Sequence, residues 1–222
     1  MNFRAAFLSA LLLLFFLSPT FSQSEAVTTL LQQGSFGPDA ERAILALFDE
    51  ADAAGVPESL LLPRLQEGIS KNVPANRIVR ALENDLATLL AARSVLEQVR
   101  GGGRILSDGA RWARAANFLA AGRTEEELRV IADACASEPE SFRQATVLYI
   151  SLLEWGVTDN AVVELVEAAV DSRLEPREFS GIPELFALAR RERVRPDRTV
   201  ERILSALPRV DSLPELRSMV IR

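Results

Sequence analysis

The chain contains no histidine, one cysteine and one lysine among its 222 residues. Histidine is the commonest general base and the commonest transition-metal ligand, so its absence removes the usual basis of both chemistries. The single cysteine, Cys135, cannot form a disulfide within the chain. Because Cys135 follows Leu128 and Ile131 at helical spacing, we expect a buried core residue rather than a reactive thiol. We predict no catalytic residue, no cofactor and no metal site.

The chain is also poor in aromatic residues and in net positive charge. Aromatic residues make up 6% of it, and 31 acids against 25 bases give a net charge of -6. Binding to nucleic acid without sequence preference depends on clustered cations against phosphate. The acidic balance therefore argues against a nucleic-acid partner.

The first residues have the three-part layout of a secretory signal peptide. Arg4 precedes an apolar run over 5–17, and Pro19 and Ser22 mark the end of the segment. The run is shorter than the roughly 20 residues of a membrane-spanning helix, and no second run of that length follows. We predict a signal peptide over 1–22, cleavage near Ser22, and a periplasmic or secreted mature chain without a transmembrane span. Retention of the segment as an uncleaved anchor is the alternative.

Apolar residues recur at helical spacing through the rest of the chain, and no stretch alternates with period two. The breaks between the apolar stripes are built alike: Gly, Asn or Arg ends one segment, and Pro, Thr or an acid opens the next. Pro57 and Pro74 lie 17 residues apart, and Thr124 and Thr158 lie 34 apart. The pattern predicts an all-α fold, an irregular α-solenoid-like stack of antiparallel helical hairpins with about 34 residues each.

Local composition predicts where this stack divides. The sequence Thr-Glu-Glu-Glu beginning at Thr124 is typical of a helix-starting capping box. The run Gly-Gly-Gly-Arg over 101–104 is costly inside any helix, and we expect a hinge with few packing contacts. The expected order is a flexible segment over 23–38, a helical portion over 39–100, this hinge, and a helical-hairpin portion over 105–222.

Residues 55–82 resemble a helical module of uncharacterised exported bacterial proteins. The residues that carry the resemblance are Gly55, Val56, Pro57, Glu67, Gly68, Lys71, Val73 and Pro74. The resemblance covers about an eighth of the chain and implies export but no known activity.

Three patterns could carry chemistry, and each has a plainer interpretation. Lys71 could activate Ser70 or Ser59, but it lies where a cation favours a helix C-terminus. The pairs Glu164 with Glu167 and Asp49 with Asp52 could act as acid and base on a glycan, although such pairs are common on helical surfaces. The acidic stretch over 49–55 lacks the ligand spacing of a calcium loop.

A partner surface is the remaining candidate. The densest basic stretch covers 190–198, and few large aromatic side chains are available to accompany it. The predicted partner-binding residues are Arg190, Arg191, Arg195, Arg198, Trp155 and Tyr149. The leading hypothesis is a non-catalytic exported protein that binds a protein or peptide, or acts as a scaffold, in the bacterial cell envelope. The alternatives are an envelope glycan hydrolase that uses paired carboxylates and a structural self-assembling protein.

Overall fold

The computed structural model describes residues 25–221, and this part of the chain contains helices and no strand. The predicted all-α fold is confirmed. The signal peptide predicted over 1–22 lies outside the described residues. The α-helices are α1 (Glu25–Gln33), α2 (Pro38–Ala53), α3 (Leu62–Ser70), α4 (Ala75–Glu97), α5 (Gly102–Leu106), α6 (Gly109–Ala120), α7 (Glu125–Ala134), α8 (Phe142–Glu154), α9 (Asp159–Val170), α10 (Ile182–Arg191), α11 (Pro196–Ala206) and α12 (Leu213–Val220).

Four short 3-10 helices complete the described chain: η1 (Glu58–Leu60), η2 (Pro139–Ser141), η3 (Pro176–Gly181) and η4 (Leu207–Arg209). None of the helices between residues 25 and 221 has both the length and the apolar character needed to cross a membrane.

The helix α1 lies inside the segment for which flexibility was expected. Val27 and Leu31 are spaced four residues apart on one face of α1, and both are buried. This apolar face packs against α3. Burial of the two side chains offsets the cost of ordering a short helix. Residues 25–33 of this segment are therefore helical and packed in the described chain.

Five turns between helices share one geometry, the left-handed C-terminal cap. In each turn one residue has a positive φ, and the N–H of the next residue donates to the carbonyl five residues earlier, as in a Schellman motif. The positive-φ residues are Gly55, Asn72, Gly122, Gly156 and Arg193, with φ of 67°, 50°, 81°, 74° and 59°, and the donors that follow them are Val56, Val73, Arg123, Val157 and Val194. The predicted function of Gly, Asn or Arg as helix ends is confirmed at these turns.

The start of α7 confirms the predicted capping box. The Glu127 amide donates to the Thr124 hydroxyl at 3.2 Å, and the Thr124 amide donates to Glu127 Oε2 at 2.6 Å. Two amides that no helical carbonyl can satisfy are bonded in this way.

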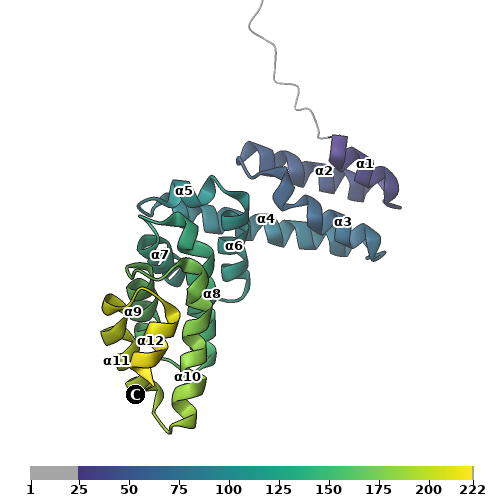
Figure 1. Ribbon diagram of the computed structural model, residues 1–222. Helices are drawn as coiled ribbons and strands as arrows, with labels where there is room; N and C mark the ends of the chain where they lie inside the picture. Colours follow the sequence, from purple (N-terminus) through teal and green to yellow (C-terminus); the bar gives the residue numbers. More distant parts are fainter. Residues whose placement is uncertain (1–24, 222) are drawn as a thin grey trace, which may run out of the picture.

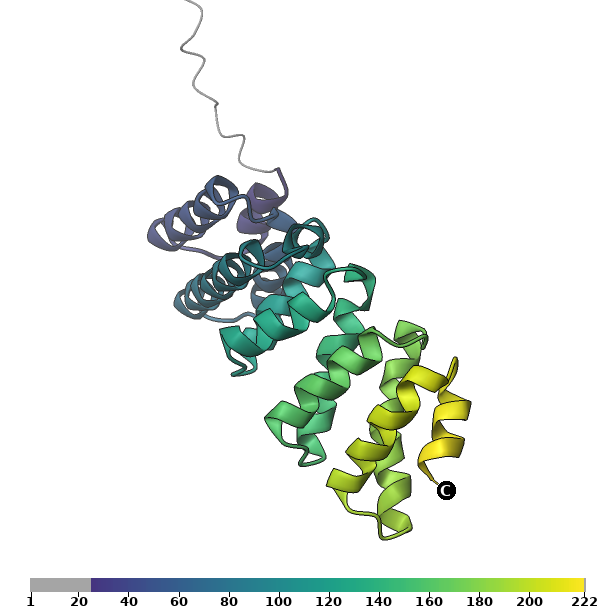
Figure 2. The same cartoon turned by 90° about the vertical axis from the view of Figure 1, so that its left-hand side faces the viewer.

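The longest helix between residues 25 and 221, α4, connects α2 and α3 to α6 and α7. It packs against α2 and α3 at one end and against α6 and α7 further along, so that α1–α3 form an arm beside the main body (Figure 1). From there the helices follow one another down to α12 (Figure 2). The irregular, α-solenoid-like stack of antiparallel hairpins stays a prediction. The 23 residues of α4 and the extra helix α5 interrupt the 34-residue spacing.

The glycine run after α4 forms a packed corner. A Cβ atom on Gly101 would lie 2.8 Å from the Ala136 carbonyl oxygen, and one on Gly102 would lie 1.9 Å from the Leu96 carbonyl oxygen. Of the three glycines in this run, Gly103 alone has open space within 4 Å of an added Cβ, as judged against the described residues. The packing at the first two glycines differs from the sparse contacts expected of a hinge. The hinge itself and the domain division at this run stay predictions.

Candidate functional site

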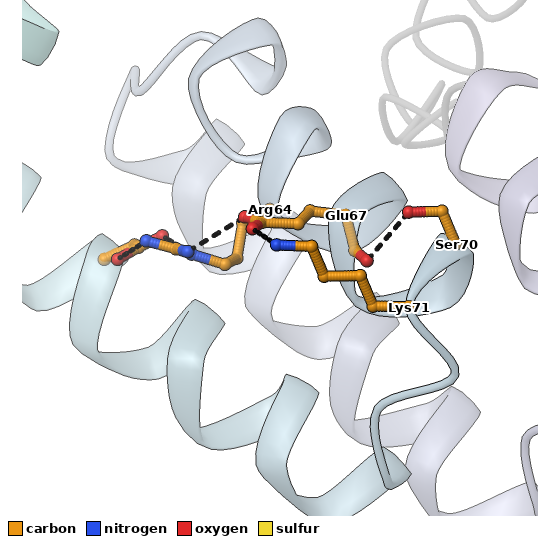
Figure 3. A network of polar contacts seen from close by, with 5 residues as sticks. Arg64, Glu67, Ser70 and Lys71 are labelled. Atoms are coloured by element: carbon orange, nitrogen blue, oxygen red, sulfur yellow. Dashed lines mark hydrogen bonds and ion pairs between the residues drawn. The ribbon is translucent and has the colours of Figure 1, made fainter.

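The lysine candidate belongs to a network of exposed ion pairs rather than to a catalytic pair (Figure 3). Lys71 Nζ donates to Glu67 Oε1 at 2.6 Å, and Arg64 Nη1 donates to Glu67 Oε2 at 3.1 Å. Arg64 Nε also donates to Asp85 Oδ2 at 2.7 Å, which ties α3 to α4. Lys71, followed by Arg64, lowers the pKa of Glu67 below its ordinary value. The Ser70 hydroxyl donates its proton to the Glu67 backbone carbonyl and not to Lys71. The two side chains therefore do not form the hydrogen bond that a Ser/Lys catalytic pair needs.

Lys71→Ala is expected to leave the free energy of unfolding nearly unchanged, because exposed ion pairs contribute little to stability. The Lys71 side chain is 65% exposed. Gly55→Val is expected to cost about 1–2 kcal/mol, since the added β-branched side chain would have to adopt the left-handed region, where Gly55 has a φ of 67°. Chemical denaturation of both variants measures this contrast. If Lys71→Ala lost binding activity while its stability was unchanged, Lys71 would instead be a functional residue.

The carboxylate pairs do not define a reaction centre. Asp49 and Asp52 are exposed on α2, and Glu164 and Glu167 are exposed on α9. Glu167 lines a cavity of about 520 Å³, whereas Glu164 is not among its lining residues. The cavity is lined by Arg100, Arg104, Asp133, Ala134, Ala136, Ser137, Glu167 and Asp171. Between residues 25 and 221 no group of three acidic or cysteine side chains has the arrangement of a metal site.

Arg104 has a structural role in this charged cavity. Its Nη2 group donates to the Ala136 carbonyl and joins α5 to the chain after α7. Acids and arginines from α7, α9 and the α4–α5 corner therefore face one another across the cavity. This mixture of charges suits a solvated junction between helices better than a pair of carboxylates that act as acid and base.

Two of the partner-binding candidates, Trp155 and Arg190, meet at the turns that follow α8 and α10. Trp155 is the C-cap residue of α8 and is half-buried, and its ring stacks on Phe186 of α10. The ring centroids lie 6.5 Å apart at 28°. The two aromatic residues share a pocket of about 160 Å³, lined by Trp155, Phe186, Arg190, Val194, Pro196 and Thr199.

The sequence pattern of the α10–α11 turn shapes this pocket. Phe186 and Arg190 are one helical turn apart on α10, so both side chains reach the same face. Arg193 adopts φ 59° and ends α10, which brings Val194 back over the helix, and Pro196 then opens α11. The Thr199 hydroxyl donates to the Arg195 carbonyl at 3.1 Å and fixes the first turn of α11.

The five arginines of the stretch 190–198, which we call the rim arginines, differ in their partners. Arg195 pairs with Asp197 at 3.1 Å, and Arg198 pairs with Glu201 at 2.6 Å. Within residues 25–221, no ion pair or side-chain hydrogen bond engages the other three, which are Arg190, Arg191 and Arg193. Of these three, Arg190 lines the pocket, so the pocket contains one guanidinium without an ion pair in the described chain.

Tyr149 lies elsewhere, in the core between α6, α7 and α8. Its relative exposure is 0%, its ring meets Phe118 edge-to-face with centroids 5.6 Å apart, and its hydroxyl donates to Glu127 Oε1 at 2.9 Å. A side chain without exposed surface cannot contact a partner, so the structure removes Tyr149 from the candidate surface. The predicted residues that the pocket brings together are Trp155 and Arg190.

The residues that the sequence prediction missed are Phe186, Val194, Pro196 and Thr199. Two of them could have been predicted from their positions in the sequence. Phe186 precedes Arg190 by four residues, and Val194 follows the residue that ends α10. Both positions can be derived from the helix period and the turn pattern.

Fold and site together define an all-α protein with a small aromatic pocket at the turns between helices. No protein-family model, curated protein or solved structure matches the chain in our comparisons. The functional argument therefore depends on the geometry of the chain itself.

Proposed function

We propose that this protein is a non-catalytic, exported protein of the bacterial cell envelope that binds an acidic segment of another protein. The segment places one apolar side chain in the pocket between Trp155 and Phe186, and its acids meet the arginines of the rim. The aromatic pocket is the observation that carries this proposal.

The size of the pocket favours a side chain as its occupant. Pockets for drug-sized molecules have volumes of about 300–1,000 Å³, whereas this one measures about 160 Å³. A cavity of about 150 Å³ can hold one benzene molecule. The pocket thus has room for one aromatic or branched aliphatic side chain, as in interfaces where a few anchor residues supply most of the affinity.

The charge of the rim favours an acidic partner. The stretch 190–198 holds five arginines and two acids, which gives it a formal charge of +3 in a chain whose net charge is -6. Guanidinium groups recognise carboxylates through paired hydrogen bonds. Arg190 lies in the pocket lining itself, so a carboxylate beside the anchor side chain would reach it.

Residues 1–22 support the exported location of the proposal. One cation, an apolar stretch and small residues before Gln23 have the order of a signal peptide. We expect the protein recovered from the envelope fraction to begin near Gln23. The binding experiment uses this mature form of the protein.

Trp155→Ala is expected to weaken binding of an acidic peptide at least about tenfold, because truncation of an anchor contact typically costs about 2 kcal/mol or more. The probe is a short, fluorescently labelled peptide with one phenylalanine between aspartates, and anisotropy measures its binding. Two matched peptides separate the contributions: one replaces phenylalanine with serine, and the other replaces aspartates with asparagines. Both are expected to bind more weakly than the parent.

Met219→Ala is the matched protein variant. Met219 is 40% exposed on α12 and does not line the pocket. It should bind the parent peptide like the unmodified protein. Equal binding by Trp155→Ala at unchanged helical content, or equal binding of the serine peptide, would contradict the proposal. Concentration-dependent self-association without peptide binding would support the self-assembly alternative.

A further inference from the structure

A second pocket lies near the start of α8, away from the aromatic pocket. Its volume is about 320 Å³, and it is lined by Arg143, Gln144, Val147, Arg177 and Ser180. Three of these residues come from the first turns of α8 and two from η3, and the two elements pack against each other. Arg143 precedes Trp155 by 12 residues, which is about 18 Å along a helix.

The lining presents hydrogen-bond donors that lack protein acceptors. In the described chain, neither the Arg143 guanidinium nor the Gln144 amide makes a side-chain hydrogen bond or an ion pair. Arg177 Nε pairs with Glu175 Oε2 at 2.7 Å. No hydrogen bond within residues 25–221 engages its Nη groups, so these can donate to a ligand.

Acids are absent from the lining of this pocket in the part of the chain that the structure describes. Of the acids nearby in sequence, Glu178 accepts hydrogen bonds from the Glu175 and Leu213 amides, and Glu140 faces Arg111 at 3.7 Å. Glu175 pairs with Arg177 from outside the lining. Two arginines therefore share one concave surface, and within residues 25–221 the acid paired with either of them is Glu175. Arginines in such an arrangement bind carboxylate or phosphate oxygens through several donors at once.

We propose that this pocket binds a small organic anion that carries two negative charges, either as two carboxylates or as one phosphate. Arg143 and Arg177 bind its oxygens, the Gln144 amide donates a further hydrogen bond, and Val147 contacts its carbon skeleton. Val147 is 39% exposed, so an apolar contact there removes surface that water now covers. The volume is at the lower end of the range for small-molecule sites. The proposal does not depend on the peptide-binding surface.

The test is isothermal titration calorimetry of the whole protein at low ionic strength with three probes. Succinate represents the dicarboxylate source, glycerol 3-phosphate the phosphate source, and succinamide the uncharged control. At least one of the two anions is expected to bind, and succinamide is not. Added salt should weaken the binding, because exposed charges are screened. The stronger of the two anions identifies which source the site fits.

Arg143→Gln and Arg177→Gln are each expected to weaken binding of that anion about tenfold, as a lost charged hydrogen bond implies. Arg173→Gln is the matched control, because Arg173 is exposed, pairs with Asp211 at 3.2 Å and lies outside the lining. It should leave the affinity unchanged. Absence of heat with both anions up to about 10 mM, equal binding of succinamide, or an equal loss in Arg173→Gln would overturn the proposal.

Discussion

Gly102→Ala is expected to lower the free energy of unfolding by about 3 kcal/mol, at the upper end of the usual cost of overpacking. The added methyl group would lie 1.9 Å from the Leu96 carbonyl oxygen and 2.8 Å from its carbon. Both atoms belong to the backbone at the end of α4, which cannot rotate away as a side chain can. The corner between α4 and α5 would have to open, and with it the contacts of these helices with α7.

Gly103→Ala is the control at the neighbouring position. No described atom lies within 4 Å of a Cβ placed there, and Gly103 is within α5. Alanine should therefore raise the free energy of unfolding by about 0.5–1 kcal/mol, the usual advantage of alanine over glycine in a helix. Urea denaturation with linear extrapolation measures both variants. Equal effects at the two positions would show that Gly102 is not in close contact with α4.

The different environments of Gly102 and Gly103 could be predicted only in part from the local sequence. Three adjacent glycines indicate a place where a helix ends, and a helix does end there. The requirement for glycine at position 102 comes from the Leu96 carbonyl, which the chain approaches only after it turns. A close approach of this kind has no signature in residue types, so the sequence predicted a loosely packed hinge.

Turns and caps were the best-predicted features, because they are determined within a few residues. Positive φ at Gly55 and Asn72 follows from the steric freedom of glycine and the tolerance of asparagine for the left-handed region. The capping box at Thr124 needs only its own side chain and that of Glu127. The all-α class follows from the same local rules together with the helical period.

Some residues of the aromatic pocket could be predicted from the local sequence, but the way they come together depends on tertiary packing. Arg190 could be named from its basic stretch and Trp155 from its amphipathic side chain. Their meeting depends on the packing of α8 against α10, two helices further along the chain. The same packing places Tyr149 in the core, although Tyr149 and Trp155 belong to the same class of amphipathic aromatic residue. Burial at these positions is decided by neighbours that are distant in sequence.

Tyr149→Ala is expected to cost about 3–5 kcal/mol, as truncation of a buried aromatic side chain typically does. Tyr149 has no exposed surface, and the substitution removes its edge-to-face contact with Phe118. Tyr149→Phe keeps the ring and removes only the hydrogen bond to Glu127 Oε1, so it should cost about 1 kcal/mol. Thermal or urea denaturation measures both. A stable Tyr149→Ala protein that fails to bind the acidic peptide would return Tyr149 to the partner surface.

Alkaline titration gives a second measurement of the same burial, because Tyr149 is the only tyrosine in the chain. Burial, followed by the hydrogen bond to Glu127, raises the pKa of Tyr149 above its ordinary value of 10.0. The neutral phenol is thus favoured in the folded state. Its contribution to stability is complete below about pH 10 and is lost as the pH rises toward the folded-state pKa. Phenolate absorbance should therefore appear above pH 10 and together with loss of helical structure. Titration near pH 10 in a fully folded protein would show that the phenol is accessible to water and that the core position of Tyr149 is wrong.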